Sequence, residues 1–135
     1  MRHGRKIKKL GRKWAHRKAL IRNLLTALFT YERIKTTVAK AKEARRWADR
    51  LITFAKKNTL AARREVRKYL ADESLVHKLF NEIAPKLQDR TSGYTHLYRL
   101  GPRPGDGAEM AILELVAKET KKRTKAVSEK TKTKE

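Results

Sequence analysis

The stretch YTHLYRLGPRPGDGAEMAILELV, residues 94–116, decides the fold class of this chain. Its two ends, residues 94–100 and 110–116, are rich in aromatic and branched side chains without helical spacing, which favours two β-strands. Residues 101–107 between them are dense in glycine and proline, as in a long turn. The stretch therefore predicts a β-hairpin. Because both strands carry apolar residues on both sides, we expect helices to cover the sheet.

Before this hairpin, apolar residues recur with the three- and four-residue spacing of helix faces. The segments with this pattern are 12–31, Thr37 to about 57, Asn58 or Thr59 to Leu70, and Asp72 to Pro85. The last three begin with residues that can cap a helix N-terminus, and the proline marks the expected end of the last. The β-branched run 32–37 predicts a short third strand. The predicted fold is α+β, with four or so helices packed on a small, mostly antiparallel three-stranded sheet.

The length of 135 residues suits one folded domain. We expect a basic N-terminal arm at residues 1–12, a single α+β domain at 13–117, and a Lys-rich flexible tail at 118–135. The tail has only Ala126 and Val127 as apolar residues. Such a segment cannot bury enough apolar surface to offset the entropy that ordering costs.

The chain is strongly basic, with 36 Lys and Arg against 14 Asp and Glu and a net charge of +22. This field attracts polyanions, so a nucleic acid is a better expectation than a small-molecule substrate. The charge is uneven: residues 1–31 contain ten cations and no acid, whereas residues 73–117 contain five cations and six acids. The absence of cysteine excludes disulfides and thiolate metal sites. No secretory signal pattern follows Met1, and no run of apolar residues predicts a membrane span.

No pattern typical of catalysis is present. The four histidines do not have the spacing of a helical metal site, and neither a nucleophile elbow nor a phosphate-binding glycine loop occurs. Asp106, which lies between two glycines, fits a turn better than a general base. We therefore expect no enzymatic activity, no cofactor and no metal.

The basic N-terminus is the strongest functional signal in the sequence. Its cations are dense and free of acids, and its glycines allow the backbone to approach a partner closely. A solubilising arm is the alternative, but acidic residues would serve solubility at least as well. We predict that the arm neutralises RNA phosphates. The residues concerned are Arg2, His3, Arg5, Lys6, Lys8, Lys9, Arg12 and Lys13.

The first predicted helix extends this basic segment. Its polar residues His16, Arg17, Lys18, Arg22 and Asn23 recur at helical spacing and are predicted to contact phosphates and 2′-hydroxyls. The alternative is an ordinary solvated face. On the second predicted helix, the cations are expected to pair with neighbouring acids: Lys42, Arg45, Arg46 and Arg50 with Glu43 and Asp49.

A third candidate is the short segment that precedes the hairpin. Arg90 supplies a cation, and Gly93 allows a close approach to a partner. Tyr94 has two possible roles at this stage: stacking on an unpaired base, or packing on the sheet.

The two tryptophans do not form an evident stacking platform in the sequence. Trp47 is expected in the core, and Trp14 either in the core or on the surface. No zinc-finger, basic-zipper or helix-turn-helix signature appears. Recognition of a folded nucleic acid by its shape therefore fits better than sequence-specific readout of DNA.

A series of motifs runs in order, without large gaps, through residues 1–117. They are Met1-Arg2-His3, Leu10-Gly11-Arg12, His16-Arg17-Lys18-Ala19, Arg22-Asn23, Ile34-Lys35-Thr36-Thr37, Ala41-Lys42-Glu43-Ala44-Arg45, Leu51-Ile52, Ala55-Lys56, Lys78-Leu79-Phe80, Ile83-Ala84-Pro85, Gly93-Tyr94-Thr95, Arg103-Pro104-Gly105-Asp106-Gly107-Ala108 and 110–116. Together these motifs resemble the bacterial ribosomal large-subunit protein seventeen family. One departure is Trp14-Ala15, where the family commonly has a small polar pair.

The resemblance implies a small α+β domain bound to large-subunit ribosomal RNA near the exit of the nascent-peptide tunnel. It implies neighbouring large-subunit ribosomal proteins as further partners and a cytoplasmic location in the ribosome. It also implies that Met1 is the family's own start, so that the basic N-terminus is an RNA arm rather than a mitochondrial presequence. Further RNA-binding residues are carried over from the matching motifs: Lys35, Thr36, Thr37 and Arg103.

Two other classes of function fit the composition. A nucleoid-type DNA-binding protein would also be basic and free of cysteine, and would prefer duplex DNA to ribosomal RNA. A cationic protein acting at membrane surfaces would need a helix that exposes large apolar residues. Here the apolar stripes are needed for the core of the domain, so we expect no membrane partner.

Overall fold

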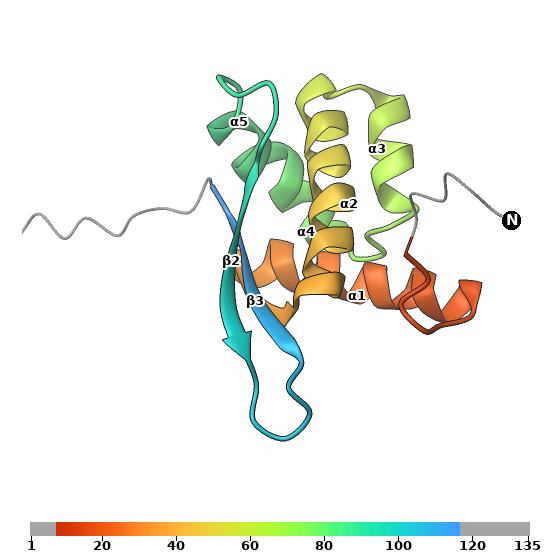
Figure 1. The fold of residues 1–135 in the computed structure, drawn as a ribbon. Helices are drawn as coiled ribbons and strands as arrows, with labels where there is room; N and C mark the ends of the chain where they lie inside the picture. Colours follow the sequence, from red (N-terminus) through yellow and green to blue (C-terminus); the bar gives the residue numbers. More distant parts are fainter. Residues whose placement is uncertain (1–7, 117–135) are drawn as a thin grey trace, which may run out of the picture.

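A computed structural model describes residues 8–116 of the chain. Residues 1–7 of the predicted arm and the whole predicted tail, 118–135, lie outside the described residues. The elements follow in the order α1 (Trp14–Tyr31), β1 (Arg33–Thr37), α2 (Val38–Lys57), α3 (Leu60–Arg67), α4 (Glu73–Lys78), a π-helical turn η1 (Leu79–Ile83), α5 (Ala84–Lys86), β2 (Thr95–Pro102) and β3 (Glu109–Leu115). The predicted α+β class is confirmed (Figure 1).

The sheet has the strand order β1-β3-β2, and both neighbouring pairs are antiparallel. The predicted hairpin and the predicted third strand are therefore both present. Leu113 lies opposite Ile34 on one side and Leu97 on the other. The register of β2 shifts between Arg99 and Gly101, where the glycine has a φ of 87°. A bulge of this kind bends a strand and increases its twist.

Helices cover the sheet, as expected, but on one face only. Ala111, Leu113 and Leu115 of β3 point to the helices and are buried. On the opposite face Ile112 is half-buried, and Tyr98 is 52% exposed. Figure 1 shows α2 running alongside β2 and β3. Apolar alternation alone does not distinguish a covered face from an open one.

The long helix α2 is the centre of the packing. Its buried face combines Ala41, Ala44 and Ala48 with Leu51 and Ile52. Small side chains let neighbouring elements approach closely, and α2 packs against α1, α3, η1, α5 and all three strands. The hydrophobic core is one continuous cluster that includes residues of α1, α2, α3, η1 and β3.

The helix boundaries follow from local chemistry. Helices α1 and α2 end at Glu32 and Asn58, which have the left-handed backbone that closes many helices, and the N–H groups of these residues donate to carbonyls of the last turn. Thr59 and Asp72 cap α3 and α4 through their side chains, as predicted. Thr37 occupies the N-cap position of α2, but its side chain makes no capping hydrogen bond.

The helical stretch that begins at Glu73 ends at Lys86, one residue after the predicted end at Pro85. Before Pro85 the chain takes the π-helical turn η1, after which the N–H of Ala84 donates to the carbonyl of Leu79. Pro85 then lies in the first turn of α5, where its missing N–H is not needed. The wider turn keeps Leu79, Ile83 and Ala84 buried in the core.

Replacing the cap of α3 tests its contribution to stability. The Thr59 hydroxyl accepts a hydrogen bond from the N–H of Ala62 at 3.2 Å. Thr59→Ala is expected to lower the free energy of unfolding by about 1 kcal/mol, because this N–H loses its partner. Urea unfolding followed by circular dichroism measures the change. Thr59→Ser keeps the hydroxyl and should match the wild type; equal stability of the alanine variant would contradict a capping role.

Candidate nucleic-acid interface

The segment before α1 is ordered by a tight turn. Leu10 and Gly11 both have positive φ angles, 55° and 65°, and the N–H of Arg12 donates to the carbonyl of Lys9 at 3.1 Å. The Arg12 guanidinium also donates to the carbonyl of Leu10 at 3.1 Å. Lys8 and Lys9 are exposed. The predicted arm residues Arg2, His3, Arg5 and Lys6 lie outside the described residues.

The N-terminus of α1 concentrates positive charge. Lys13 is the N-cap, no acid occurs in the first turn, and the partial positive charge of the helix dipole is therefore not offset there. Lys13 and His16 are exposed, whereas Arg17 and Lys18 are half-buried. The Nε of Arg12 lies 3.4 Å from the Nε2 of His16, as its donor. The arrangement suits an anionic partner, because free backbone N–H groups and cations point to the same end of one helix.

One predicted site residue on α1 has a structural partner. The Arg22 guanidinium donates to the carbonyl of Lys68 at 2.7 Å and so ties α1 to the end of α3. Asn23 beside it is exposed. RNA contact by either residue stays a prediction, and for Arg22 the guanidinium has further N–H groups beyond the one that holds Lys68.

The ion pairs predicted between the cations of α2 and its acids are not formed as close contacts, although the charge of Arg45 still lowers the pKa of Asp49. Within the described part of the chain, no salt bridge joins Glu43 or Asp49 to the cations of this helix. Glu43 is buried, whereas Lys42 and Arg46, which neighbour it on the helix, are exposed. Helical spacing alone does not predict that Glu43 is buried. The exposed cations of α2 therefore join the candidate interface: Lys42, Arg45, Arg46 and Arg50.

Asp49 instead connects α2 to the start of β2. The hydroxyl of Thr95 lies 3.4 Å from its carboxylate, as donor. Partial burial raises the pKa of Asp49 above its ordinary value, against the opposing effects of Arg45 and of hydrogen bonds from the Tyr94 backbone and the Thr95 side chain.

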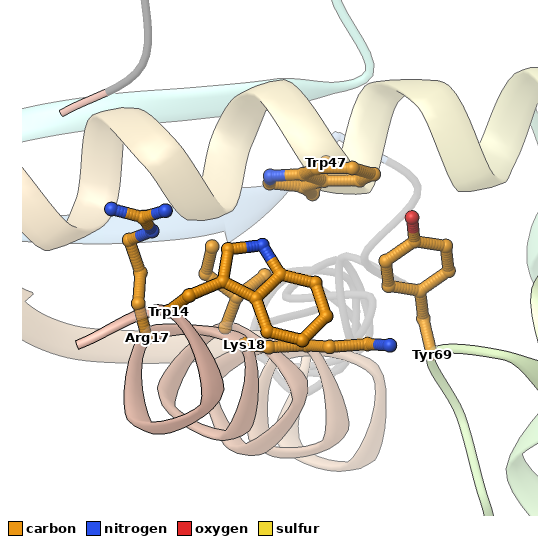
Figure 2. A pocket seen from close by; sticks show the side chains of 6 residues that line it. Trp14, Arg17, Lys18, Trp47 and Tyr69 are labelled. Carbon is orange, nitrogen blue, oxygen red and sulfur yellow. The ribbon is translucent and has the colours of Figure 1, made fainter. Parts of the chain in front are cut away.

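A pocket of about 190 Å³ opens where α1, α2 and the turn after α3 meet. Figure 2 shows Trp14 of α1 and Trp47 of α2 on opposite sides of it, with Tyr69 beside them. No relation between the two tryptophans was evident in the sequence, but both line this pocket. They lie 33 positions apart in the sequence, and only the packing of α1 on α2 brings them together. The lining residues are Trp14, Arg17, Lys18, Ile21, Trp47 and Tyr69.

The structure decides between the two roles that the sequence left open for Tyr94. Its ring is buried, and its hydroxyl donates to the carbonyl of Thr91 at 2.8 Å. The Lys56 ammonium lies 5.3 Å from the ring centre and also donates to the carbonyl of Arg90. No face of the Tyr94 ring is open to a base, so packing on the core is its role. Arg90 is exposed beside it, and Gly93 has a φ of 68°.

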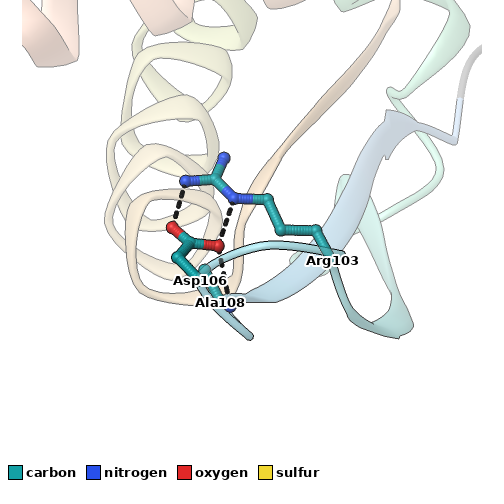
Figure 3. A network of polar contacts seen from close by, with 3 residues as sticks. All are labelled: Arg103, Asp106 and Ala108. Atoms are coloured by element: carbon teal, nitrogen blue, oxygen red, sulfur yellow. Dashed lines mark hydrogen bonds and ion pairs between the residues drawn. The ribbon is translucent and has the colours of Figure 1, made fainter.

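The hairpin loop uses Arg103 for its own structure. Figure 3 shows the Arg103 guanidinium in a two-pronged contact with the Asp106 carboxylate, through Nε at 2.7 Å and Nη2 at 2.6 Å. Asp106 also accepts a hydrogen bond from the N–H of Ala108 at 3.2 Å. These contacts hold the pKa of Asp106 far below its usual range and raise that of Arg103. Asp106 thus has the turn role predicted for it.

The remaining predicted site residues belong to β1. Lys35 is exposed on the open face of the sheet, opposite Ile112, whereas Thr36 and Thr37 are half-buried. Tyr98 lies on the same open face of β2, with its ring centre 6.0 Å from that of His96. Ile112 of β3 lies between Lys35 and Tyr98, so the cation and this aromatic pair share the open face without being neighbours.

The fold and its surface define a small basic α+β protein that offers cations and aromatic rings to a partner. Within residues 8–116, no cluster of His, Asp and Glu side chains could hold a metal ion. None of the helices in that range has the length and apolarity needed to cross a lipid bilayer.

Comparisons with known proteins name the family. The family model described as "Ribosomal protein L17" matches residues 20–116. The chain belongs to this family, as its motifs indicated, and the family is structural and not enzymatic. A protein of Natranaerobius thermophilus is 59% identical over 109 residues, 81% of this chain and 96% of the relative. A protein of Fusobacterium nucleatum is 53% identical over 116 residues, 86% of this chain and 100% of the relative. Both relatives are named large ribosomal subunit protein bL17.

Proposed function

We propose that this protein is a structural constituent of the large ribosomal subunit that binds and stabilises ribosomal RNA in the cytoplasm. The names of its relatives support the assignment to the large subunit. The observation that carries RNA binding is the acid-free basic segment of residues 8–31, together with the exposed cations of α2, which form no salt bridge within the described part of the chain. Cations that form no ion pair with acids of the same chain are available to neutralise phosphates, and the phosphates then release their counterions.

The division of the chain supports a two-sided arrangement. The proposed arm at residues 1–12 and helix α1 face RNA, and the proposed domain at 13–117 carries its near-neutral part at the sheet end. Residues 73–117 balance five cations against six acids, so this stretch has no net attraction for RNA phosphates. Neighbouring ribosomal proteins are therefore proposed at that end, and the position near the exit of the peptide tunnel follows from the family resemblance. No role is assigned to the tail at 118–135.

Sedimentation of a cell extract tests this function directly. On a sucrose gradient the protein is expected to travel with large subunits, and to leave them when the salt concentration is raised, because its contacts are mainly ionic. A tagged copy detected by immunoblotting gives the readout. In a competition experiment with the purified protein, ribosomal RNA should displace duplex DNA. Protein found only in the free pool, or a preference for duplex DNA, would overturn the proposal in favour of a nucleoid-type function.

A further inference from the structure

The pocket between Trp14 and Trp47 has the shape and chemistry of an aromatic binding site. Trp47 is packed against the core and is held by Tyr69, whose ring centre is 4.7 Å away. Trp14 is 67% exposed, although it is the first residue of a well-formed helix. A large aromatic ring that is exposed beside an apolar pocket is typical of a surface that binds a partner. Two indoles from different helices can enclose a flat, aromatic group (Figure 2).

The charges around the pocket indicate the chemistry of the group that it binds. The Lys18 ammonium lies 5.1 Å from the Trp14 ring centre, and the Arg50 guanidinium lies 5.5 Å from that of Trp47. Arg17 lines the pocket as well, and none of its lining residues is acidic. An aromatic group that is flanked by negative charge complements both features, and this is the chemistry of a nucleotide. An apolar protein side chain would fill the pocket but would gain nothing from the surrounding cations.

We propose that this pocket binds one unpaired nucleobase of RNA, stacked on Trp14, with the flanking phosphates held by Arg17, Lys18 and Arg50. The inference rests on the proposed RNA-binding function and names the element of RNA that is recognised. Stacking of a base on an aromatic side chain tolerates any base identity, because every base has a π-face. The pocket therefore selects RNA with an unstacked nucleotide, such as a bulge, over a continuous duplex.

Tryptophan fluorescence gives a direct readout, because the chain has two tryptophans and both line the pocket. The full-length protein is titrated with an RNA hairpin that carries one bulged adenosine, and with the same hairpin fully paired. We expect the bulged RNA to quench the emission and to bind roughly 10-fold more tightly than the paired RNA. Trp14→Ala should remove this preference, and Trp14→Phe should retain most of it, since a phenyl ring also stacks.

Tyr31→Ala is the matched control. Tyr31 is an aromatic residue at the other end of α1, is 73% exposed, and does not line the pocket. This variant should keep the preference for the bulged RNA. Because Trp14 and Tyr31 are both largely exposed, circular dichroism should show that both variants remain folded.

The outcomes separate this inference from the function on which it rests. If the two RNAs bind with equal affinity, or if Trp14→Ala keeps the preference, the base-binding role fails while RNA binding stands. Tight binding of the bulged RNA without any change in tryptophan emission also overturns it, and leaves the pocket to an apolar side chain of a neighbouring protein. If neither RNA binds, the proposed function itself fails.

Discussion

Raising the salt concentration from 50 to 200 mM is expected to weaken the binding of ribosomal RNA by this protein roughly 10³- to 10⁵-fold. This range holds for a protein that neutralises about six to ten phosphates, because each contact releases condensed counterions whose return to the RNA is favoured by salt. The acid-free surface of residues 8–31 and the exposed cations of α2 supply enough charges for such contacts. Filter binding at several salt concentrations gives the slope of log affinity against log salt.

Two double variants with the same loss of charge test where the phosphates bind. Lys9→Ala with Lys13→Ala removes exposed cations before α1, and should reduce the salt slope by about one to two. Arg67→Ala with Lys68→Ala removes cations that already pair with Glu73 and Glu65. This control should leave the slope almost unchanged. A flat salt response of the wild type, or an equal effect of both variants, would contradict an electrostatic interface at the N-terminus of α1.

Truncating Phe29 is expected to destabilise the fold by about 3–5 kcal/mol. The side chain is completely buried in the cluster to which α1, α2, η1 and the sheet contribute. Phe29→Ala removes its transfer free energy and leaves a cavity that the rigid packing around α2 cannot close. The loss is a large fraction of the stability of a small domain, so thermal unfolding should show a much lower midpoint, or no cooperative transition.

Tyr31→Ala is again the matched control, since Tyr31 lies two positions further along α1 and is mostly exposed. This variant should change the free energy of unfolding by no more than about 0.5 kcal/mol. A similar loss in both variants would mean that α1 is stabilised by helix formation alone. Equal stability of Phe29→Ala and the wild type would contradict the placement of α1 on the core.

The helices and the hairpin could be predicted because their signals are local. The apolar stripe of α1, the capping residues Thr59 and Asp72, and the glycine- and proline-rich loop each act within a few positions of the chain. The end of the fourth helix near Pro85 is a local signal of the same kind. The π-helical turn before it could not be predicted in this way, because this turn keeps Ile83 in contact with a core that is built from distant elements.

The candidate site, like the fold, could be predicted from the sequence only in part. The excess of cations and its concentration before residue 32 are properties of composition, and they lead to a polyanionic partner without any structure. Composition does not show which of these cations form ion pairs with acids of the chain. Glu43 is buried and forms no salt bridge among the described residues, whereas Asp106 pairs with Arg103 three positions before it. Whether these residues form ion pairs depends on where their side chains point, which spacing along the sequence does not specify by itself.

The sequence by itself determined the α+β class, the family, the net charge of +22 and the acid-free segment that carries much of it. These depend on residue types and on short-range periodicity. Only the tertiary structure decided that Tyr94 is buried, that one face of the sheet is open, and that Trp14 and Trp47 share a pocket. The physical reason is that burial and contact between distant positions are set by how α1, α2 and the sheet pack on one another, and that packing is a property of the whole core.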